Sequence, residues 1–240
     1  MNEITQGTLL DGRVIYKQWR AGHRSGFEPV LLAACVPARP GEWVLETGTG
    51  AGAALLCLSA RVADLRGMGV ERVERLAALA SENFKINNID NFFAIQADAT
   101  SLPFPARQFH HVLANPPWFG AASTPSPDSA RTLAHHAPPG LLQGWIAELA
   151  RVLRWRGSLS LILPAAALTQ ASAALRAHGF GGVQLLPLWP RAGVAAKMFI
   201  LRARLGGKAP DEILPGLILH DESGITPAAQ AVLRGGAGLL

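Results

Sequence analysis

The sequence has little cysteine and shows no internal repeat or long linker. Cys35 and Cys57 are the two cysteines among 240 residues, too few for a disulfide scaffold. Apolar residues make up 49% of the chain and include six Trp and nine Phe, a composition that excludes intrinsic disorder. A chain of this size can stabilise its own core without disulfides, so we expect a reducing, cytoplasmic setting.

The sequence also lacks an apolar run that is typical of a membrane span. The longest uncharged stretch, 157–175, approaches the ~20 residues that a span requires. Pro164 divides it into a half that alternates like a strand and an Ala-rich half that also contains Ser, Thr and Gln. The N-terminal residues MNEITQG form neither the basic nor the apolar region of a secretory signal. We therefore expect no secretion and no membrane partner.

One segment has no acidic residue. The net charge is +5, from 22 basic and 17 acidic residues, a modest excess that favours a polyanionic partner. The segment 191–208 contains five basic residues and no acid: Arg191, Lys197, Arg202, Arg204 and Lys208. The other 17 basic residues balance the 17 acidic ones, so the excess coincides with this segment.

Expected strands and helices alternate along most of the chain. Residues 6–20 predict two short strands around the turn signal Asp11-Gly12, and a short helix is expected at 28–36. Further strands are expected at 43–46, 65–71, 92–97, 109–114, 158–163, 183–188 and 196–204. Helices are expected at 53–62, around Val73–Phe84, around Leu142–Leu153 and at 165–177. We therefore predict an α/β fold with a Rossmann-like, seven-stranded, mainly parallel sheet and helices on both faces.

This alternation divides the chain into three parts. Residues 1–40 form a short N-terminal hairpin and helix packed on the core, residues 41–205 form the core, and residues 206–240 form a C-terminal extension of unknown role. Because such sheets bind ligands beyond the carboxyl ends of their strands, we expect the site at those ends.

Glycines occupy every second position immediately after the first core strand, in the motif ETGTGAG at 46–52. Glycine permits a positive φ and the close backbone approach that a bound ligand demands. The third glycine comes one residue earlier than in the dinucleotide fingerprint G-x-G-x-x-G, which disfavours NAD. A turn that needs glycine only for its backbone conformation can explain any one of these glycines. It is a poor explanation for all three together.

Acidic residues follow the next two core strands. Glu71 ends the second strand, about 20 residues beyond the glycines, where a carboxylate can accept both hydroxyls of a ribose. A carboxylate favoured by the start of a helix is the alternative explanation of Glu71. Asp98 follows the third strand, where it can accept the exocyclic amine of an adenine ring, and a solvated loop residue is its alternative.

In their order and spacing these motifs resemble the class I S-adenosylmethionine-dependent methyltransferases, over residues 25–165. The resemblance implies S-adenosylmethionine as the cofactor and S-adenosylhomocysteine as its product. It assigns the cofactor site to these residues: Glu46, Thr47, Gly48, Thr49, Gly50, Gly52, Glu71, Asp98, Ala99 and Asn115.

The sequence Asn115-Pro116-Pro117-Trp118 follows the fourth core strand. A planar amine is hard to methylate because its lone pair is delocalised, so an enzyme must favour a pyramidal nitrogen. The side-chain oxygen of Asn115 and the carbonyl of Pro116 can accept both N–H bonds of the amine, and two prolines set the carbonyl direction in advance. Trp118 offers a face on which a base can stack, worth about 1–3 kcal/mol. An ordinary turn, with Trp118 in the core, is the structural alternative.

This motif resembles the N-P-P-[YF] motif of amino-methyltransferases, which act on adenine or guanine amines in nucleic acid and on glutamine in proteins. Trp118 stands where Tyr or Phe is usual. The resemblance implies four catalytic residues: Asn115, Pro116, Pro117 and Trp118.

Within that group the sequence is similar to bacterial tRNA (adenine-N(6)-)-methyltransferases that modify the purine beside the anticodon of a valine tRNA. The similarity rests on GFEPVLL at 26–32, on the Ala-Arg and His-His pairs in 130–136, and on AAKMFIL at 195–201. It implies methyl transfer to the N(6) amine of an adenine in a tRNA anticodon loop. RNA contacts are expected from Arg131, Lys197, Arg202 and Arg204, with the last two on one strand face.

Other functions remain open. A protein glutamine N(5)-methyltransferase of the HemK type uses the same geometry. Such enzymes usually carry a separate N-terminal helical domain, and the segment before the first core strand is short for such a domain. Guanine N(2) methylation of rRNA and adenine methylation of DNA use the same chemistry. A non-catalytic RNA-binding module is the alternative from another class, and the intact Gly48, Gly50, Gly52 and Asn115 argue against it. His135 and His136 have no Cys or acidic partner at metal spacing, so we expect no metal site.

Overall fold

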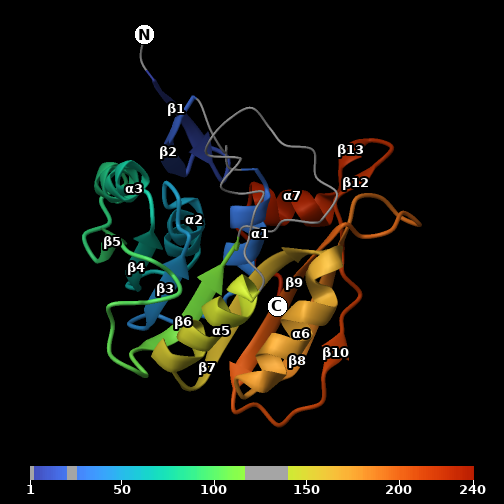
Figure 1. Ribbon diagram of the computed structural model, residues 1–240. Helices are drawn as coiled ribbons and strands as arrows, with labels where there is room; N and C mark the ends of the chain where they lie inside the picture. The colour runs from blue at the N-terminus through green and yellow to red at the C-terminus, as the bar shows by residue number, and fades with distance from the viewer. Residues whose placement is uncertain (1–2, 21–25, 117–139) are drawn as a thin grey trace.

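The computed structural model describes residues 3–20, 26–116 and 140–240. Its centre is a nine-stranded sheet of order β10-β8-β9-β7-β6-β3-β4-β5, in which β11 also pairs with β8 (Figure 1). These strands are β3 (Trp43–Thr47), β4 (Arg66–Glu71), β5 (Phe92–Gln96), β6 (Phe109–Ala114), β7 (Leu153–Pro164), β8 (Phe180–Trp189), β9 (Met198–Leu205), β10 (Glu212–Ile213) and β11 (Leu217–Ile218). Strands β3 to β7 are parallel to one another, whereas β9 runs antiparallel between β7 and β8.

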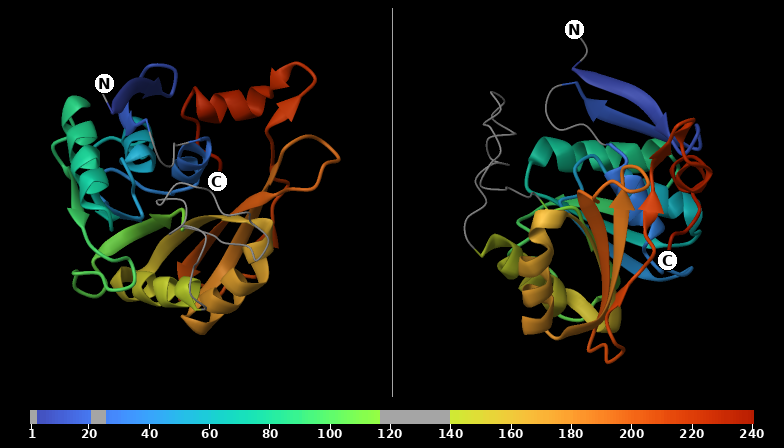
Figure 2. Two further views of the ribbon diagram at one scale, coloured as in Figure 1. Left: turned by 45° about the horizontal axis from the view of Figure 1, so that its top comes forward. Right: turned by 90° about the vertical axis from the view of Figure 1, so that its right-hand side faces the viewer.

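Helices cover both faces of the sheet (Figure 2). One face is covered by α1 (Glu28–Ala34), α2 (Ala53–Arg61), α3 (Glu74–Ile86) and α7 (Pro227–Leu233). The other face is covered by α5 (Leu141–Val152) and by α6 (Leu168–Ala177), which the short helix η1 (Ala165–Ala167) precedes. Neighbouring strand residues point into different cores: Val44 packs with the first layer and Leu45 with the second. The predicted Rossmann-like α/β fold is confirmed.

Two asparagines attach the N-terminal hairpin to the core: Asn83 within α3 and Asn87 at the C-cap of the same helix. As predicted, two antiparallel strands, β1 (Ile4–Leu9) and β2 (Val14–Trp19), flank the turn at Asp11. The side chain of Asn83 accepts from the backbone N–H of Lys17 and donates to its carbonyl, both at 2.9 Å. Asn87 makes the same pair of bonds with Ile15, at 2.8 and 2.7 Å. These amides satisfy the free edge of β2 as a third strand would.

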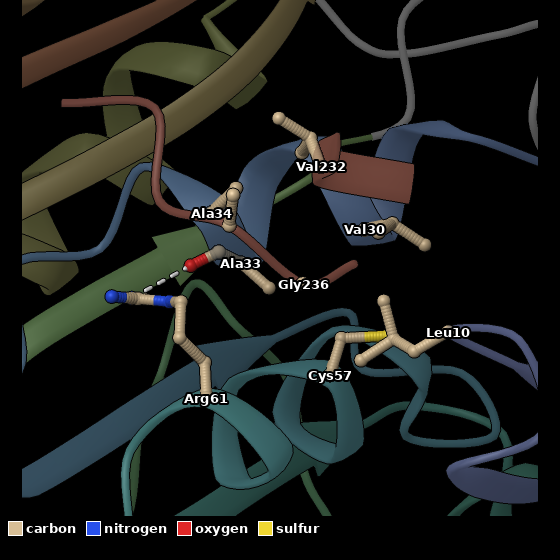
Figure 3. Close-up of a pocket in the computed structure, with 9 residues that line it drawn as sticks. Leu10, Val30, Ala33, Ala34, Cys57, Arg61, Val232 and Gly236 are labelled. Carbon is tan, nitrogen blue, oxygen red and sulfur yellow. Dashed lines mark hydrogen bonds between the residues drawn. The ribbon is translucent and has the colours of Figure 1, made fainter. Parts of the chain in front are cut away.

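The C-terminal segment 206–240 packs on the core. It supplies β10 and β11, two strands more than the seven predicted, a short pair β12 (His220–Asp221) and β13 (Gly224–Ile225), and α7, which lies against α1. Side chains of four segments line a small cavity there (Figure 3): Leu10, Val30, Cys57 and Val232. Arg61 donates to the carbonyl of Ala33 at 3.0 Å, and the N–H of Leu239 donates to Ala34 at 2.9 Å. The segment therefore closes one layer of the core.

Several strand and helix ends differ by a few residues from the prediction, and the largest difference is at the start of β7, which was expected at residue 158. Leu153 is the first residue of β7, where it pairs with Phe109, and does not belong to the preceding helix. The side chain is fully buried, as the apolar spacing indicates, but α5 passes into β7 without a loop. No turn residue marks this change in the sequence, so the helical spacing extends one residue too far.

The uncharged stretch 157–175 is divided among three elements. It forms the end of β7, the short helix η1 and most of α6, and Pro164 stands at the first of these changes. Over the described ranges, no helix combines the length and the apolar character needed to cross a membrane.

Candidate functional site

Four parallel strands end at the same level. Thr47 of β3 pairs with Val70 of β4 and with Ala114 of β6, and Val70 pairs in turn with Ile95 of β5. Adjacent strands lie about 4.8 Å apart. The next residues therefore form one row across the end of the sheet, in the order Gln96, Glu71, Gly48 and Asn115. We call this end of the parallel strands the carboxyl edge.

The glycine loop 48–52 connects β3 to α2 at this row. Its three glycines have φ values of 71°, 55° and 87°, in the left-handed region that favours glycine. At Gly52 an added Cβ would lie 2.8 Å from the Phe84 ring, so the loop rests directly on α3. At Gly50 such an atom would meet nothing within 4 Å. The backbone of the loop is therefore open on that side to a ligand.

Two carboxyl groups support this loop. Glu46 is 4% exposed and accepts from the Thr49 hydroxyl at 2.7 Å. Burial, and to a smaller extent the neighbouring Glu71, raise the pKa of Glu46 to about 8. Glu71 accepts the N–H groups of Gly50 and Val73, both at 3.0 Å. Since Val73 is the N-cap of α3, Glu71 both supports a helix start and faces the loop.

Neither carboxyl group has a cationic partner. In the part of the chain that the structure describes, no Lys or Arg forms an ion pair with Glu46 or Glu71. A buried or half-buried acid without such a partner is stabilised in its charged form by a cationic ligand. The chemistry of this donor set thus suits a positively charged molecule.

Asp98 and Ala99 follow β5, just beyond the row. Asp98 Oδ1 accepts from the hydroxyl and the N–H of Thr100, at 2.6 and 2.8 Å. These two hydrogen bonds lower the pKa of Asp98, so its exposed carboxylate stays ionised at neutral pH. Its other oxygen has no hydrogen-bond partner within the described residues and remains available.

Trp145 of α5 was not foreseen as a site residue. Its indole N–H donates to Thr47 Oγ1 at 2.8 Å, which satisfies both of these buried groups. A Cβ added at Gly48 would lie 3.6 Å from the Trp145 ring, so the ring covers the start of the loop. Trp145 lies on the apolar stripe of its helix, and that position alone explains its burial. The sequence therefore carried no separate signal of this contact.

Asn115 and Pro116 lie at the end of β6. Asn115 is half-buried, Pro116 is buried, and the preceding Ala114 pairs with strands on both sides. Within the described residues the Asn115 amide has no hydrogen-bond partner. Pro117, Trp118 and Arg131 lie outside the residues that the structure describes.

The three other expected RNA contacts lie at different heights on the sheet. Lys197 is exposed directly before β9, at the carboxyl edge, because Met198 pairs with Pro164 at the end of β7. Arg202 is half-buried and donates to Gln184 Oε1 at 2.6 and 3.1 Å. Arg204 pairs with Ser158 near the opposite end of the sheet. Seven residues of strand separate Arg204 from Lys197, about 23 Å.

A cavity of about 350 Å³ lies beside Lys197. Its wall is mostly apolar and comes from the start of α1, the ends of β8 and β9, and Leu219: Gly26, Phe27, Glu28, Leu31, Leu188, Pro190, Lys197, Met198 and Leu219. A space of this size is in the range of small-molecule sites.

Comparisons with known proteins agree with this geometry. A family model described as a methyltransferase domain matches residues 44–157, from β3 to the start of β7. The tRNA1(Val) (adenine(37)-N6)-methyltransferase of Tolumonas auensis is 28% identical over 219 residues, 90% of this chain and 84% of the relative. The crystal structure of a predicted O-methyltransferase from Agrobacterium tumefaciens has a TM-score of 0.73 at 24% identity, over 88% of this chain and 97% of that one.

The chain is an S-adenosylmethionine-dependent methyltransferase. The methyltransferase is also 29% identical to the release factor glutamine methyltransferase of Thermodesulfovibrio yellowstonii, over 91 residues, which are 38% of this chain and 32% of the relative. Its cofactor is S-adenosylmethionine, which carries a methyl group on a positively charged sulfur.

The carboxyl edge of the methyltransferase fits this cofactor. The open backbone at Gly50 admits a close ligand, and Glu46 and Glu71 offer carboxyl groups that no cation neutralises. Over the described ranges, no three His, Cys, Asp or Glu side chains form a group that could hold a metal ion.

Proposed function

We propose that the methyltransferase acts on the N(6) amine of an adenine in the anticodon loop of a tRNA. The observation that carries the proposal is Asn115, whose amide has no partner in the described structure and stands beside Gly48 at the carboxyl edge. The tRNA-modifying relative, similar over 90% of this chain, supports this choice of substrate. A tRNA substrate places the reaction in the cytoplasm.

The proposed role of Asn115 is to hold the reacting amine. Its side-chain oxygen accepts one N–H of the amine, and the carbonyl of Pro116 accepts the other. These two bonds favour a pyramidal nitrogen whose lone pair is free to attack the methyl group. The transfer itself needs no general base, and the extra proton leaves the nitrogen afterwards to solvent.

The structure supports this role through rigidity. Ala114 is paired with Thr47 on one side and Leu161 on the other, so the backbone that carries Asn115 is held by both neighbouring strands. The buried ring of Pro116 fixes its own φ and removes one N–H donor. An acceptor that is held in place before the substrate binds does not have to be ordered during the reaction.

The remaining residues of the proposed site have separate roles. Glu46, Glu71, Asp98 and the loop 48–52 would bind the cofactor, Pro117 and Trp118 would complete the catalytic motif, and Trp118 would stack on the target base. Lys197 is exposed at the same edge and would contact a phosphate, as would Arg131. Arg202 is a weaker candidate for RNA binding because its guanidinium group is held by Gln184.

Labelled S-adenosylmethionine tests the substrate class directly. The protein is incubated with separate pools of unmodified tRNA, rRNA, DNA and protein, and the labelled product is identified by mass spectrometry. We expect N(6)-methyladenine in the tRNA pool, at an anticodon-loop position. Label in rRNA or DNA would contradict the choice of tRNA.

Methylation of a protein glutamine is the second candidate function. The similarity to a release factor glutamine methyltransferase over 91 residues favours it. In the same experiment, label on a glutamine of the protein pool and none in nucleic acid would replace the adenine proposal with this one.

A further inference from the structure

Three arginines and a tryptophan gather at the opposite end of the sheet, which we call the amino edge. Arg154, Trp155 and Arg156 are consecutive exposed residues at the start of β7. Arg204 joins them from the end of β9, since it pairs with Ser158. In Figure 1 the arrowhead of β9 marks this end of the sheet. We call these four residues the amino-edge patch.

The tryptophan of the patch is held in place but open to solvent. Trp155 is 61% exposed, an unusual value for so large an apolar side chain. Its indole lies directly on Gly206, where an added Cβ would come 2.1 Å from the ring. Gly206 has a φ of 68°, in the left-handed region, and thereby lets the chain pass beneath the indole. One side of the ring is therefore packed, and much of the remainder is free for a partner.

The three arginines carry uncompensated charge. Arg204 donates to the carbonyl of Arg156 at 3.3 Å, Arg156 to Gly206 at 3.4 Å, and Arg154 to Gln108 at 3.1 Å. These acceptors are backbone carbonyls, and Arg154 also contacts Nε2 of the His110 ring at 2.6 Å. No ion pair of the described residues includes any of the three arginines. The carbonyls orient each guanidinium group and leave further N–H donors for a ligand.

Two arginines near the patch are arranged differently. Arg151, three residues before Arg154, forms an ion pair with Glu148 at 2.7 Å. Arg176 forms one with Asp211 at 2.6 Å. Charge on these arginines is neutralised locally, whereas charge on the patch is not.

We propose that the amino-edge patch binds RNA, with the arginines on phosphates and an unpaired base on Trp155. Guanidinium groups pair with phosphate oxygens, and an aromatic face among basic residues is how proteins hold single-stranded nucleic acid. A second copy of this chain is a poorer partner, because a two-fold contact would bring the same positive charges together.

The patch lies outside the reach of the methyl-transfer chemistry. Leu161 pairs with Ala114, whereas Leu153, next to Arg154, pairs with Phe109, which lies five residues before Ala114 and about 17 Å along β6. The patch therefore holds a part of the RNA other than the reacting nucleotide. Like the proposed function, this proposal requires RNA as the partner. Unlike the proposed function, it does not depend on which atom is methylated.

Binding of a full-length unmodified tRNA transcript tests the patch without any methyl transfer. Fluorescence anisotropy of labelled tRNA is measured with the whole protein, without S-adenosylmethionine, over a range of salt concentrations. We expect the Kd of Arg154→Ala/Arg156→Ala to rise about tenfold or more, and the slope of log K against log salt to fall by about 0.7–0.9 per lost phosphate contact. Trp155→Ala is expected to weaken binding about fivefold or more, and Trp155→Phe much less.

A matched control removes the same charge elsewhere. Lys85 of α3 and Arg234 after α7 are exposed and form no ion pair among the described residues. Lys85→Ala/Arg234→Ala should bind tRNA nearly as the unchanged protein does. A cooperative thermal unfolding transition is used to check that each variant is folded. If Trp155→Ala is not folded, the double arginine variant and Trp155→Phe still test the proposal.

Four results would overturn the proposal, three of them from the variants. These three are unchanged tRNA binding in folded patch variants, an equal loss in the control, and loss of self-association in the patch variants by sedimentation. Absence of RNA binding by the unchanged protein would also overturn it, whatever the methyl acceptor is. Conversely, label on a protein glutamine would remove the proposed function but leave this binding result standing.

Discussion

The two edges of the central sheet carry charges of opposite sign. At the carboxyl edge, the carboxylates of Glu71 and Asp98 lie without a cationic ion-pair partner among the described residues, and the glycine backbone beside Glu71 is open. At the amino edge, the arginines of the amino-edge patch lie without a carboxylate partner beside an exposed indole. Each edge matches a ligand of the opposite charge: a sulfonium cofactor at one, a phosphate chain at the other.

The difference teaches that net charge is a poor guide to the functional surface. The protein has a charge of +5, yet its proposed cofactor site is acidic. Because the edges are separated by about 17 Å of β6, more than the Debye length of about 8 Å, charges at one are largely screened from the other at physiological salt. Chemistry at the carboxyl edge and RNA binding at the amino edge should therefore respond to different substitutions.

The largest effect is expected from Asn115→Ala at the carboxyl edge. Loss of the amide acceptor should lower kcat about a hundredfold or more, because the amine then loses a group that favours its reactive geometry. Binding of S-adenosylmethionine by calorimetry should remain, and Asn91→Ala, an exposed asparagine, serves as control. Equal loss of cofactor binding and catalysis would contradict the assigned role.

Glu71→Gln should weaken cofactor binding about tenfold with a smaller effect on RNA affinity. Both oxygens of Glu71 accept backbone N–H groups, and a glutamine turns an NH2 toward one of those donors. The Kd for S-adenosylhomocysteine, measured by calorimetry, checks this. Glu74→Gln, an exposed residue of the same helix region, is the control, and an equal change in both variants would show that only helix charge matters.

Arg204→Ala should separate the two edges in steady-state kinetics. The KM for tRNA is expected to rise a few-fold while kcat at saturating tRNA stays unchanged, because the residue contacts no reacting atom. Lys85→Ala provides the matched loss of one exposed charge. A fall in kcat without a change in KM would connect the amino edge to the chemistry and remove the distinction.

A last prediction, of a different kind, concerns pH and the stability of the ligand-free protein. The pKa of Glu46 is raised by burial to about 8, so the folded chain retains a proton that the unfolded chain loses at lower pH. Stability should therefore fall as pH rises from about 5 to 8, by about 1 kcal/mol per unit. Urea unfolding at pH 6 and 7.5 should show this slope in the unchanged protein and less of it in Glu46→Gln. Equal slopes would exclude Glu46 as its source.

Much of the fold was predictable because it follows from local spacing. Alternating apolar residues and helical stripes indicated the seven core strands and their helices, and Asp11-Gly12 indicated the hairpin turn. Leu153 was misplaced since no turn residue separates α5 from β7. The strands β10 and β11 have two residues each, too few to produce a period, so the seven-stranded prediction omitted them.

The site was partly predictable for the same reason. The glycine loop, Glu71 and Asn115 each follow a strand, and parallel pairing places such residues in one row. Trp145 was missed as a loop contact because helical spacing already explains its burial. The amino-edge patch was missed because Arg204 and Arg154 are fifty positions apart and meet only through the pairing of β7 with β9.

The sequence by itself determined the layered α/β fold, the glycine loop and the order of the motifs, since these depend on backbone sterics and apolar periodicity within short windows. The tertiary structure alone decided where the basic side chains of segment 191–208 lie on the sheet. Strand register placed Lys197 at the carboxyl edge, turned Arg202 toward Gln184, and brought Arg204 to the amino edge. Register is set by pairing between distant segments, so no local pattern in those residues could reveal it.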